Sequence, residues 1–115
     1  MTRPRRSHED CPNEAVLQAL KCIAGRWKIL ILRQLQEGAI GFNALERALP
    51  GISPKMLRQQ LRELEADGLV TRTELISTPP KTVRYTLAPL GRTLIPVLDT
   101  IGEWGRKWLN VPERR

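Results

Sequence analysis

Side chains that can bind an anion gather in one short segment of the chain, GISPKMLRQQLRELEADGL, residues 51–69. Lys55, Arg58 and Arg62 are three or four positions apart, a spacing that groups side chains on the surface of a helix. Their cationic groups donate charge-assisted hydrogen bonds to phosphate oxygens, and the amide of Gln59 can both donate and accept. This segment therefore has the chemistry to hold a polyanion and to discriminate between groups displayed on it.

Other kinds of chemistry are poorly supplied. The single histidine, His8, and the two cysteines, Cys11 and Cys22, lack the spacing of a metal site or of a disulfide framework. No nucleophile has a candidate base beside it, and there is no glycine-rich phosphate loop. We therefore expect no enzymatic activity, no metal site and no cofactor.

Local signals place the anion-binding side chains on a capped helix. Ser53 is a favourable N-cap and Pro54 a favourable first helical residue. The core side is expected to carry Leu57, Leu61 and Leu64, with Lys55, Gln59 and Arg62 roughly opposite and Arg58 and Met56 on the flanks.

The order of charges along this helix opposes the helix dipole. Lys55 and Arg58 come first, and Glu63, Glu65 and Asp67 come last. Each basic residue in the first turn costs about 0.3–1 kcal/mol unless something compensates. A phosphate at the N-terminal half would satisfy both the cations and the free backbone N–H groups. The alternative is an ordinary solvated face.

Length and composition indicate one small basic domain. The chain has 115 residues, 41% of them hydrophobic, and a net charge of +7. We expect a flexible basic tail over 1–10, a single domain over 11–109 and a C-terminal tail over 110–115. The charge favours nucleic acid as a partner. Neither a membrane span, a lipidation motif nor a secretory signal is evident, so a cytoplasmic protein is predicted.

The remaining segments predict a mainly α fold with a small β-hairpin. Helical periodicity follows Pro12 as far as Gly25, and then recurs in 26–38, 41–49 and 88–109, while a tight turn at Pro50 and Gly51 precedes the capped helix. Residues 69–76 and 82–87 are rich in Val, Thr and Ile and read as two strands around STPPK. This order is that of a winged helix-turn-helix with additional helices at both ends.

In a helix-turn-helix, the N-terminal half of the second helix reaches base edges in DNA. Lys55, Arg58 and Gln59 are therefore candidates for reading sequence, with Met56 beside them. Ser53 and Arg62 are candidates for phosphate contacts. Lys81 and Arg84, with Thr78 and Thr82, would form a basic wing, although a plain surface hairpin is equally consistent. A winged-helix module that binds protein or RNA without DNA sequence specificity is the alternative function.

Several longer segments resemble the HxlR-type winged-helix transcriptional regulators, relatives of the MarR regulators. The resemblance is carried by CP at Cys11, GRWKILIL from Gly25, LPGISPKMLRQQLRELEADGLVTR from Leu49, PP at Pro79, VRYTL from Val83, and PVL and WG in the last segment. Gly41, Ala44 and Arg84 depart from the residues common in that family.

The resemblance implies a homodimer, assembled through the first and last helices, that binds a palindromic operator in double-stranded DNA as a repressor or an activator. Trp104 and Trp108 on the last turns support a dimer independently, because they exceed the apolar area that a small core needs. The expected interface residues are Val16, Leu20, Leu94, Leu98, Ile101, Trp104 and Trp108.

Cys11 is the candidate for an oxidant- or electrophile-sensing residue, as in several members of that family. A thiol at a helix N-terminus near Arg5 and Arg6 should have a lowered pKa, although Asp10 opposes this. An inert thiol is the alternative. Cys22 is expected to face the core. A small-molecule effector is compatible with the same resemblance.

Overall fold

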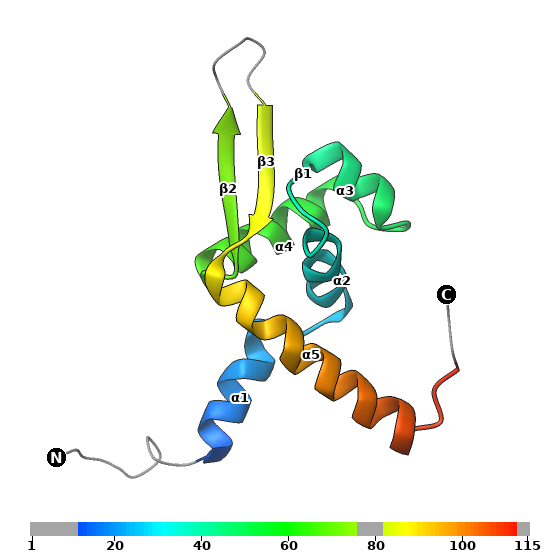
Figure 1. The fold of residues 1–115 in the computed structure, drawn as a ribbon. Coiled ribbons are helices and arrows are strands. Elements are labelled where there is room, and N and C mark those ends of the chain that lie inside the picture. Colours follow the sequence, from blue (N-terminus) through cyan, green and yellow to red (C-terminus); the bar gives the residue numbers. More distant parts are fainter. Residues whose placement is uncertain (1–11, 76–81, 113–115) are drawn as a thin grey trace, which may run out of the picture.

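The computed structural model describes residues 12–75 and 82–112. The elements are α1 (Pro12–Cys22), α2 (Arg26–Leu35), β1 (Ile40–Gly41), α3 (Phe42–Ala48), α4 (Pro54–Ala66), β2 (Val70–Leu75), β3 (Thr82–Leu87) and α5 (Pro89–Trp108). The strands form one antiparallel sheet in the order β1-β3-β2 (Figure 1). Helices dominate and the β2–β3 hairpin follows the helix-turn-helix, so the predicted winged helix-turn-helix is confirmed.

Helix α2 lies at the centre of the core. It contacts α3, α4, α5 and β3, and its residues Ile31 and Leu32 are completely buried. The continuous apolar run in this helix is what allows it to be covered on several sides. The surrounding buried residues include Leu45, Leu49, Leu57, Leu61, Leu64, Leu69, Tyr85, Leu87, Ile95 and Leu98.

The sheet has one strand more than the sequence predicted. Strands β2 and β3 pair in register from Val70 opposite Leu87 to Leu75 opposite Thr82, as expected for the hairpin. Strand β1 adds a third row, with Ile40 opposite Tyr85 and therefore Gly41 opposite Arg84. A strand of two residues cannot show the alternation that identifies strands in a sequence, so it was missed.

Helix α4 ends in a glycine turn that starts the wing. Gly68 has a φ of 80°, the backbone N–H of Leu69 donates to the carbonyl of Leu64 at 2.9 Å, and that of Gly68 donates to Glu65 at 2.9 Å. This pair of bonds is a Schellman motif, which favours glycine because its central residue is left-handed. It leads the chain directly from α4 into β2.

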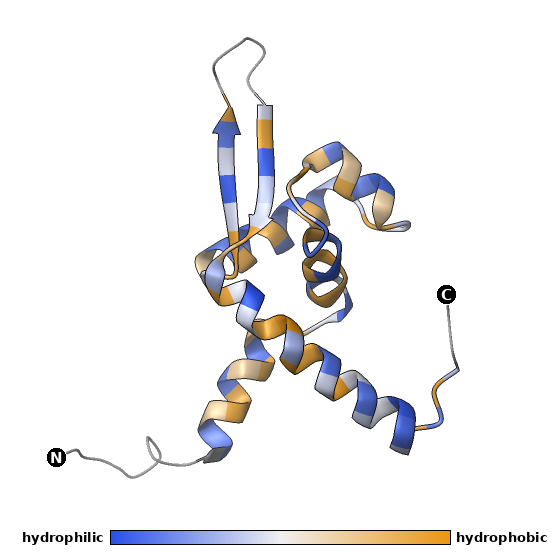
Figure 2. Cartoon of the chain, in the orientation of Figure 1, coloured by the Kyte–Doolittle hydropathy of each residue, from blue (hydrophilic) through white to orange (hydrophobic). Residues whose placement is uncertain are grey.

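Helices α1 and α5 carry much exposed apolar surface. Helix α1 extends away from the body of the fold, and α5 crosses in front of it and continues beyond α2 (Figure 1). Apolar residues follow both helices (Figure 2), and the most exposed include Leu17, Leu20, Trp104 and Trp108. None of the described helices is long and apolar enough to cross a membrane.

Candidate nucleic-acid interface

The turn between α3 and α4 fixes where α4 begins. Gly51 has a φ of 96°, a conformation that side-chain-bearing residues rarely adopt, and the N–H of Ile52 donates to Leu49 at 3.1 Å. The hydroxyl of Ser53 then accepts a hydrogen bond from the Met56 N–H at 3.0 Å. The predicted N-cap and the first helical position of Pro54 are both confirmed.

The two faces of α4 differ as predicted. Leu57, Leu61 and Leu64 are buried, and the first turn contains no acidic residue. The exposed side chains are Lys55, Met56, Arg58, Gln59 and Arg62. The N-terminal half of α4 therefore presents cations on one surface, with no acidic residue in the first turn to repel an anion.

Two contacts orient side chains on this surface. The guanidinium carbon of Arg58 lies 5.6 Å from the ring centre of Phe42 on α3, within cation–π range. The Gln60 amide lies 3.5 Å from the sulfur of Met56, one turn earlier. Arg58 is thus held between the two helices of the helix-turn-helix.

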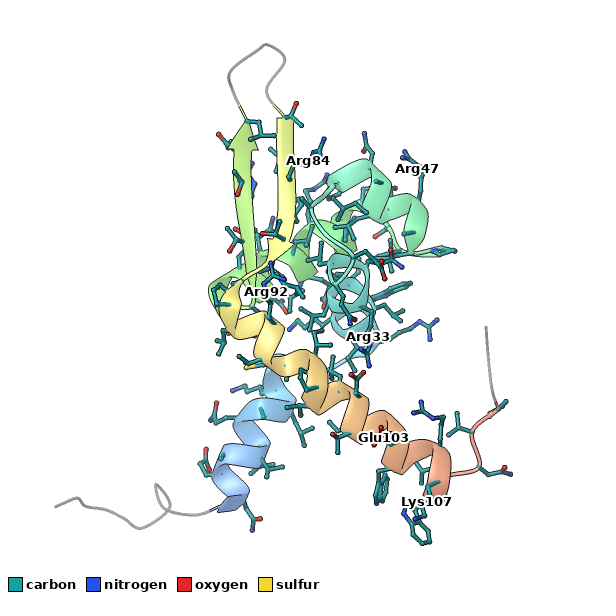
Figure 3. The ribbon with its side chains drawn as sticks, in the orientation of Figure 1. Arg33, Arg47, Arg84, Arg92, Glu103 and Lys107 are labelled. Carbon is teal, nitrogen blue, oxygen red and sulfur yellow. The ribbon has the colours of Figure 1, made fainter. Side chains whose placement is uncertain are left out.

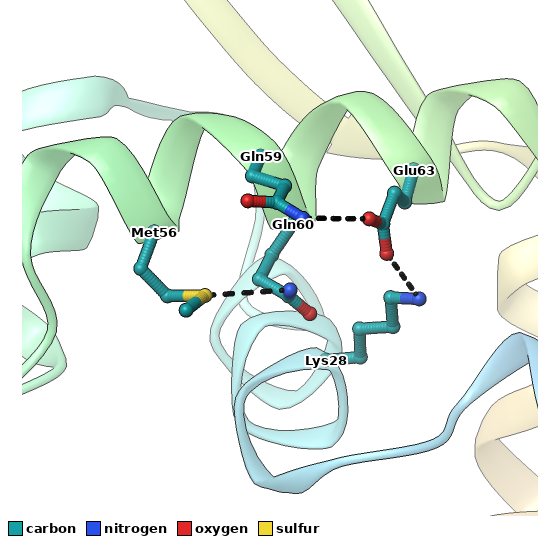
Figure 4. A network of polar contacts seen from close by, with 5 residues as sticks. All are labelled: Lys28, Met56, Gln59, Gln60 and Glu63. Atoms are coloured by element: carbon teal, nitrogen blue, oxygen red, sulfur yellow. Dashed lines mark hydrogen bonds and ion pairs between the residues drawn. The ribbon is translucent and has the colours of Figure 1, made fainter.

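Gln59 belongs to a chain of polar contacts that runs back into the core (Figure 4). Its amide nitrogen donates to Glu63 at 3.2 Å, and the other carboxylate oxygen of Glu63 lies 2.7 Å from the ammonium of Lys28 on α2. The hydrogen bond from Lys28, with a smaller contribution from Gln59, lowers the pKa of Glu63 below its ordinary value. The sequence pattern of α2 predicts burial only for its apolar residues, so the burial of Lys28 was not predicted.

A groove of about 320 Å³ lies between α4 and the sheet, lined by Arg58, Leu61, Arg62, Glu65, Arg72 and Tyr85. Arg72 on β2 forms an ion pair with Glu74 at 2.9 Å and lies opposite Tyr85. Hydrogen bonds to Glu74 and then Tyr85 raise the pKa of Arg72, so it stays charged. Arg72 was not among the predicted site residues, although strand alternation places it on the face of Val70, which is buried.

The structure separates Arg84 from α4. Tyr85 is buried against the core and Arg84 is exposed, and successive strand residues point to opposite faces of a sheet. Figure 3 shows Arg84 on β3 and Arg47 on α3 in the part of the molecule that lies away from α5. Lys81 and Thr78, the other predicted wing residues, lie outside the described residues, as does Cys11.

The residues predicted for a dimer interface fall into two groups. Leu98 is only 5% exposed and belongs to the core of its own chain, and Leu94 is partly buried against that core. The exposed group comprises Val16, Leu20, Ile101, Trp104 and Trp108. Helical periodicity placed the apolar residues of α5 on one face and assigned that whole face to a dimer interface. The N-terminal half of α5 packs on the body of the fold.

The remaining chemistry candidates are few. Cys22 is half-buried against the core, near its predicted position. Within residues 12–75 and 82–112, no group of His, Cys, Asp and Glu side chains could hold a metal ion.

Comparison with known proteins decides the family. Residues 22–113 match the model of the HxlR-like helix-turn-helix proteins. The chain belongs to this family. Its members and relatives are helix-turn-helix transcriptional regulators and not enzymes.

Individual relatives agree with the family. The chain is 44% identical over 98 residues to YtcD of Bacillus subtilis, an HTH-type transcriptional regulator; these cover 85% of this chain and 77% of YtcD. The structure is similar to a MarR-family regulator of Enterococcus faecalis, with a TM-score of 0.82, 34% identity, and coverage of 90% and 94% of the two chains. It is also similar to the reduced form of the redox regulator HypR, with a TM-score of 0.74, 40% identity, and coverage of 81% and 91%.

Proposed function

We propose that this HxlR-like regulator acts as a homodimer that recognises a specific palindromic sequence in double-stranded DNA. The observation that carries the proposal is the exposed surface of α4, where Lys55, Arg58 and Gln59 follow a serine N-cap and precede every acidic residue of the helix. Placing this N-terminal half in the major groove brings cations and an amide to base edges.

The side chains divide into two roles. Lys55, Arg58 and Gln59 read bases, since arginine and lysine pair with guanine and glutamine with adenine. Ser53 and Arg62 contact phosphates. The groove behind Arg62, with Arg72 on its far wall, adds a further place for the backbone of one strand.

Substitutions on α4 test these roles. Arg58→Ala or Gln59→Ala is expected to cost about 1–3 kcal/mol and to relax selectivity at one base pair, while Arg62→Ala weakens all sequences and lowers the salt slope by about one. Arg92→Ala, which removes an exposed charge from the first turns of α5, is the matched control. Binding sites are first selected from random DNA, and affinities are then measured by fluorescence anisotropy.

The competing function predicts a different pattern. A module that binds RNA or protein through general electrostatics would lose affinity equally for every DNA sequence in all of these variants. A uniform loss after Gln59→Ala would therefore contradict sequence reading by α4.

Exposed apolar surface supports the homodimer. On α1, Val16 and Leu20 are 54% and 49% exposed, and on α5, Trp104 and Trp108 are 57% and 65% exposed. Burying two such helices between subunits would remove this surface from water. A palindromic site requires the two copies of α4 to lie about one DNA turn apart. Sedimentation should show a dimer at micromolar concentration; a monomer there would refute it, and Trp104→Ala with Trp108→Ala should weaken the association.

Similarity to the redox regulator HypR supports a thiol response through Cys11. Oxidant should change DNA binding of the wild-type protein, and Cys11→Ser should abolish that change. Cys22→Ser, which removes a half-buried thiol, is the control and should respond like the wild type. A response that persists in Cys11→Ser would exclude Cys11 as the sensor.

A further inference from the structure

Lys28 is an unusual residue for the centre of this fold. It lies on α2 and is 8% exposed, the single charged residue in the buried class among those described. An apolar side chain of similar length would avoid the cost of desolvating the ammonium, and such replacements of buried ion pairs are often neutral or stabilising. Stability alone therefore does not explain a lysine at this position. The partner of its ammonium group supplies another explanation.

The ammonium of Lys28 fixes a carboxylate that in turn fixes Gln59. It lies 2.7 Å from one oxygen of Glu63, whose side chain is 44% exposed. The second oxygen of Glu63 accepts from the Gln59 amide nitrogen at 3.2 Å. Glu63 is ionised near neutral pH even at its ordinary pKa of 4.5, and the hydrogen bond from Lys28 lowers that pKa further.

An ionised carboxylate accepts hydrogen bonds and cannot donate them. The Gln59 amide must therefore turn its nitrogen towards Glu63, and the flipped orientation would place two acceptors together. Figure 4 shows the consequence: the amide oxygen of Gln59 points along α4 away from Glu63, towards the N-terminal half of the helix. One N–H is engaged, and the oxygen and the second N–H are free.

A fixed amide recognises fewer bases than a mobile one. In the major groove, adenine and cytosine each present an amino group that donates, whereas guanine and thymine present acceptors at the equivalent positions. An amide oxygen held away from Glu63 can pair with the amino group, and the remaining N–H of the amide matches N7 of adenine. A glutamine free to flip could instead donate to guanine or thymine.

We propose that Lys28 and Glu63 are positioning residues that hold the Gln59 amide oxygen directed away from Glu63, so that this position of the operator is read as a base with an exocyclic amino group, adenine above all. The inference rests on the proposed function, because it assumes that Gln59 faces DNA. It adds a buried residue of α2 to the determinants of specificity.

The experiment measures base preference at the operator position whose preference is lost in Gln59→Ala. Affinities are determined for all four base pairs at that position. The wild type should favour adenine by about 5- to 150-fold, the range for a well-made bidentate pair. Lys28→Met and Glu63→Gln should each reduce that preference by about threefold or more, as expected for members of one hydrogen-bond network.

Two further variants separate positioning from general effects. Glu65→Gln makes the same change of charge two residues along α4 and should alter affinity for all four base pairs equally. Lys28→Arg should restore the preference, because an open pocket of about 360 Å³ beside Lys28 and Glu63 leaves room for the larger head group. In the DNA-free protein, the NMR signals of the Gln59 side-chain amide should move in Lys28→Met and in Glu63→Gln.

The outcomes distinguish the two proposals. If Gln59→Ala abolishes the preference but Lys28→Met and Glu63→Gln leave it within about twofold of wild type, the positioning role is refuted and DNA reading by Gln59 stands. If Gln59→Ala changes no base preference, the assignment of Gln59 fails and the positioning role fails with it. A guanine or thymine preference at this position would likewise overturn the proposed orientation of the Gln59 amide.

Discussion

Gly91, in the first turn of α5, lies close to the backbone of Leu69, just before β2 begins. A β-carbon at this position would overlap the carbonyl oxygen of Leu69 and lie 3.3 Å from a methyl carbon of Leu87. The Leu69 carbonyl already accepts a hydrogen bond from the N–H of Ala88 at 3.0 Å. Because the overlapping atom belongs to the backbone, Gly91→Ala can fit only if α5 moves away from the chain segment that enters β2.

The expected cost follows from three contributions. Overpacking costs about 1–3 kcal/mol, and losing the Ala88 hydrogen bond costs about 1–3 kcal/mol if the Leu69 carbonyl stays buried. Alanine returns about 1 kcal/mol as the better helix former. We therefore expect Gly91→Ala to destabilise the protein by about 3 kcal/mol, within a range of about 1–5 kcal/mol.

Urea unfolding followed by tryptophan fluorescence and circular dichroism measures this cost. Protein concentration is kept constant, since association would contribute to the apparent stability. Gly102→Ala is the control: its nearest contact is the flexible end of Arg106, at 3.5 Å, so the change should be neutral or stabilising. An unfolding midpoint for Gly91→Ala at or above that of the wild type would refute the reasoning.

Three further predictions concern the supports of α4 and α5. Ser53→Ala should lower the free energy of unfolding by about 1 kcal/mol, because it removes the N-cap. Ser53→Asp should keep the cap but weaken DNA binding, because it adds a negative charge. Equal DNA affinity of Ser53→Asp and wild type would contradict the proposed contact of Ser53 with phosphate. The pKa of Glu63 is lowered in the folded state, so the stabilisation from this carboxylate is complete above its ordinary pKa of 4.5 and is lost as the pH falls through the lowered pKa. Urea unfolding midpoints measured between about pH 3 and pH 6 should show this loss of stability. The loss should be smaller in Glu63→Gln and in Lys28→Met. The ion pair of Arg33 on α2 with Asp99 on α5 has an N–O distance of 2.8 Å, and both side chains are at least partly exposed. A double-mutant cycle should therefore give about 0.2–1 kcal/mol, and a coupling well above that would show that the pair is shielded from solvent.

Local patterns were sufficient for most of α4. Short-range rules predict the start of the helix from Ser53 and Pro54 and its buried face from the three leucines. The structure agrees at each position. These features depend on neighbours within one or two helical turns. The exposed surface with Lys55 and Gln59 could be predicted for the same reason.

Contacts between distant segments could not be predicted in this way. The pairing of Ile40 with Tyr85 joins residues far apart in the sequence, and two residues carry too little pattern to announce a strand. The same limit applies to Arg72, whose place beside Arg62 depends on how the sheet packs against α4. For Leu98, helical spacing identifies the apolar face of α5 but does not show which surface covers that face. In the structure the chain itself buries this residue.

The sequence by itself determined the order of the helices and the hairpin, the capped helix with its basic N-terminal half, and the family, since all of these are recorded in residue types at short spacing. Only the tertiary structure decided which charges meet. The meeting of Lys28 with Glu63 depends on how α2 packs across α4, and that packing is set by the buried leucines on both helices rather than by the charged residues themselves. The orientation of Gln59, the residue proposed to read DNA, is therefore a property of the folded core.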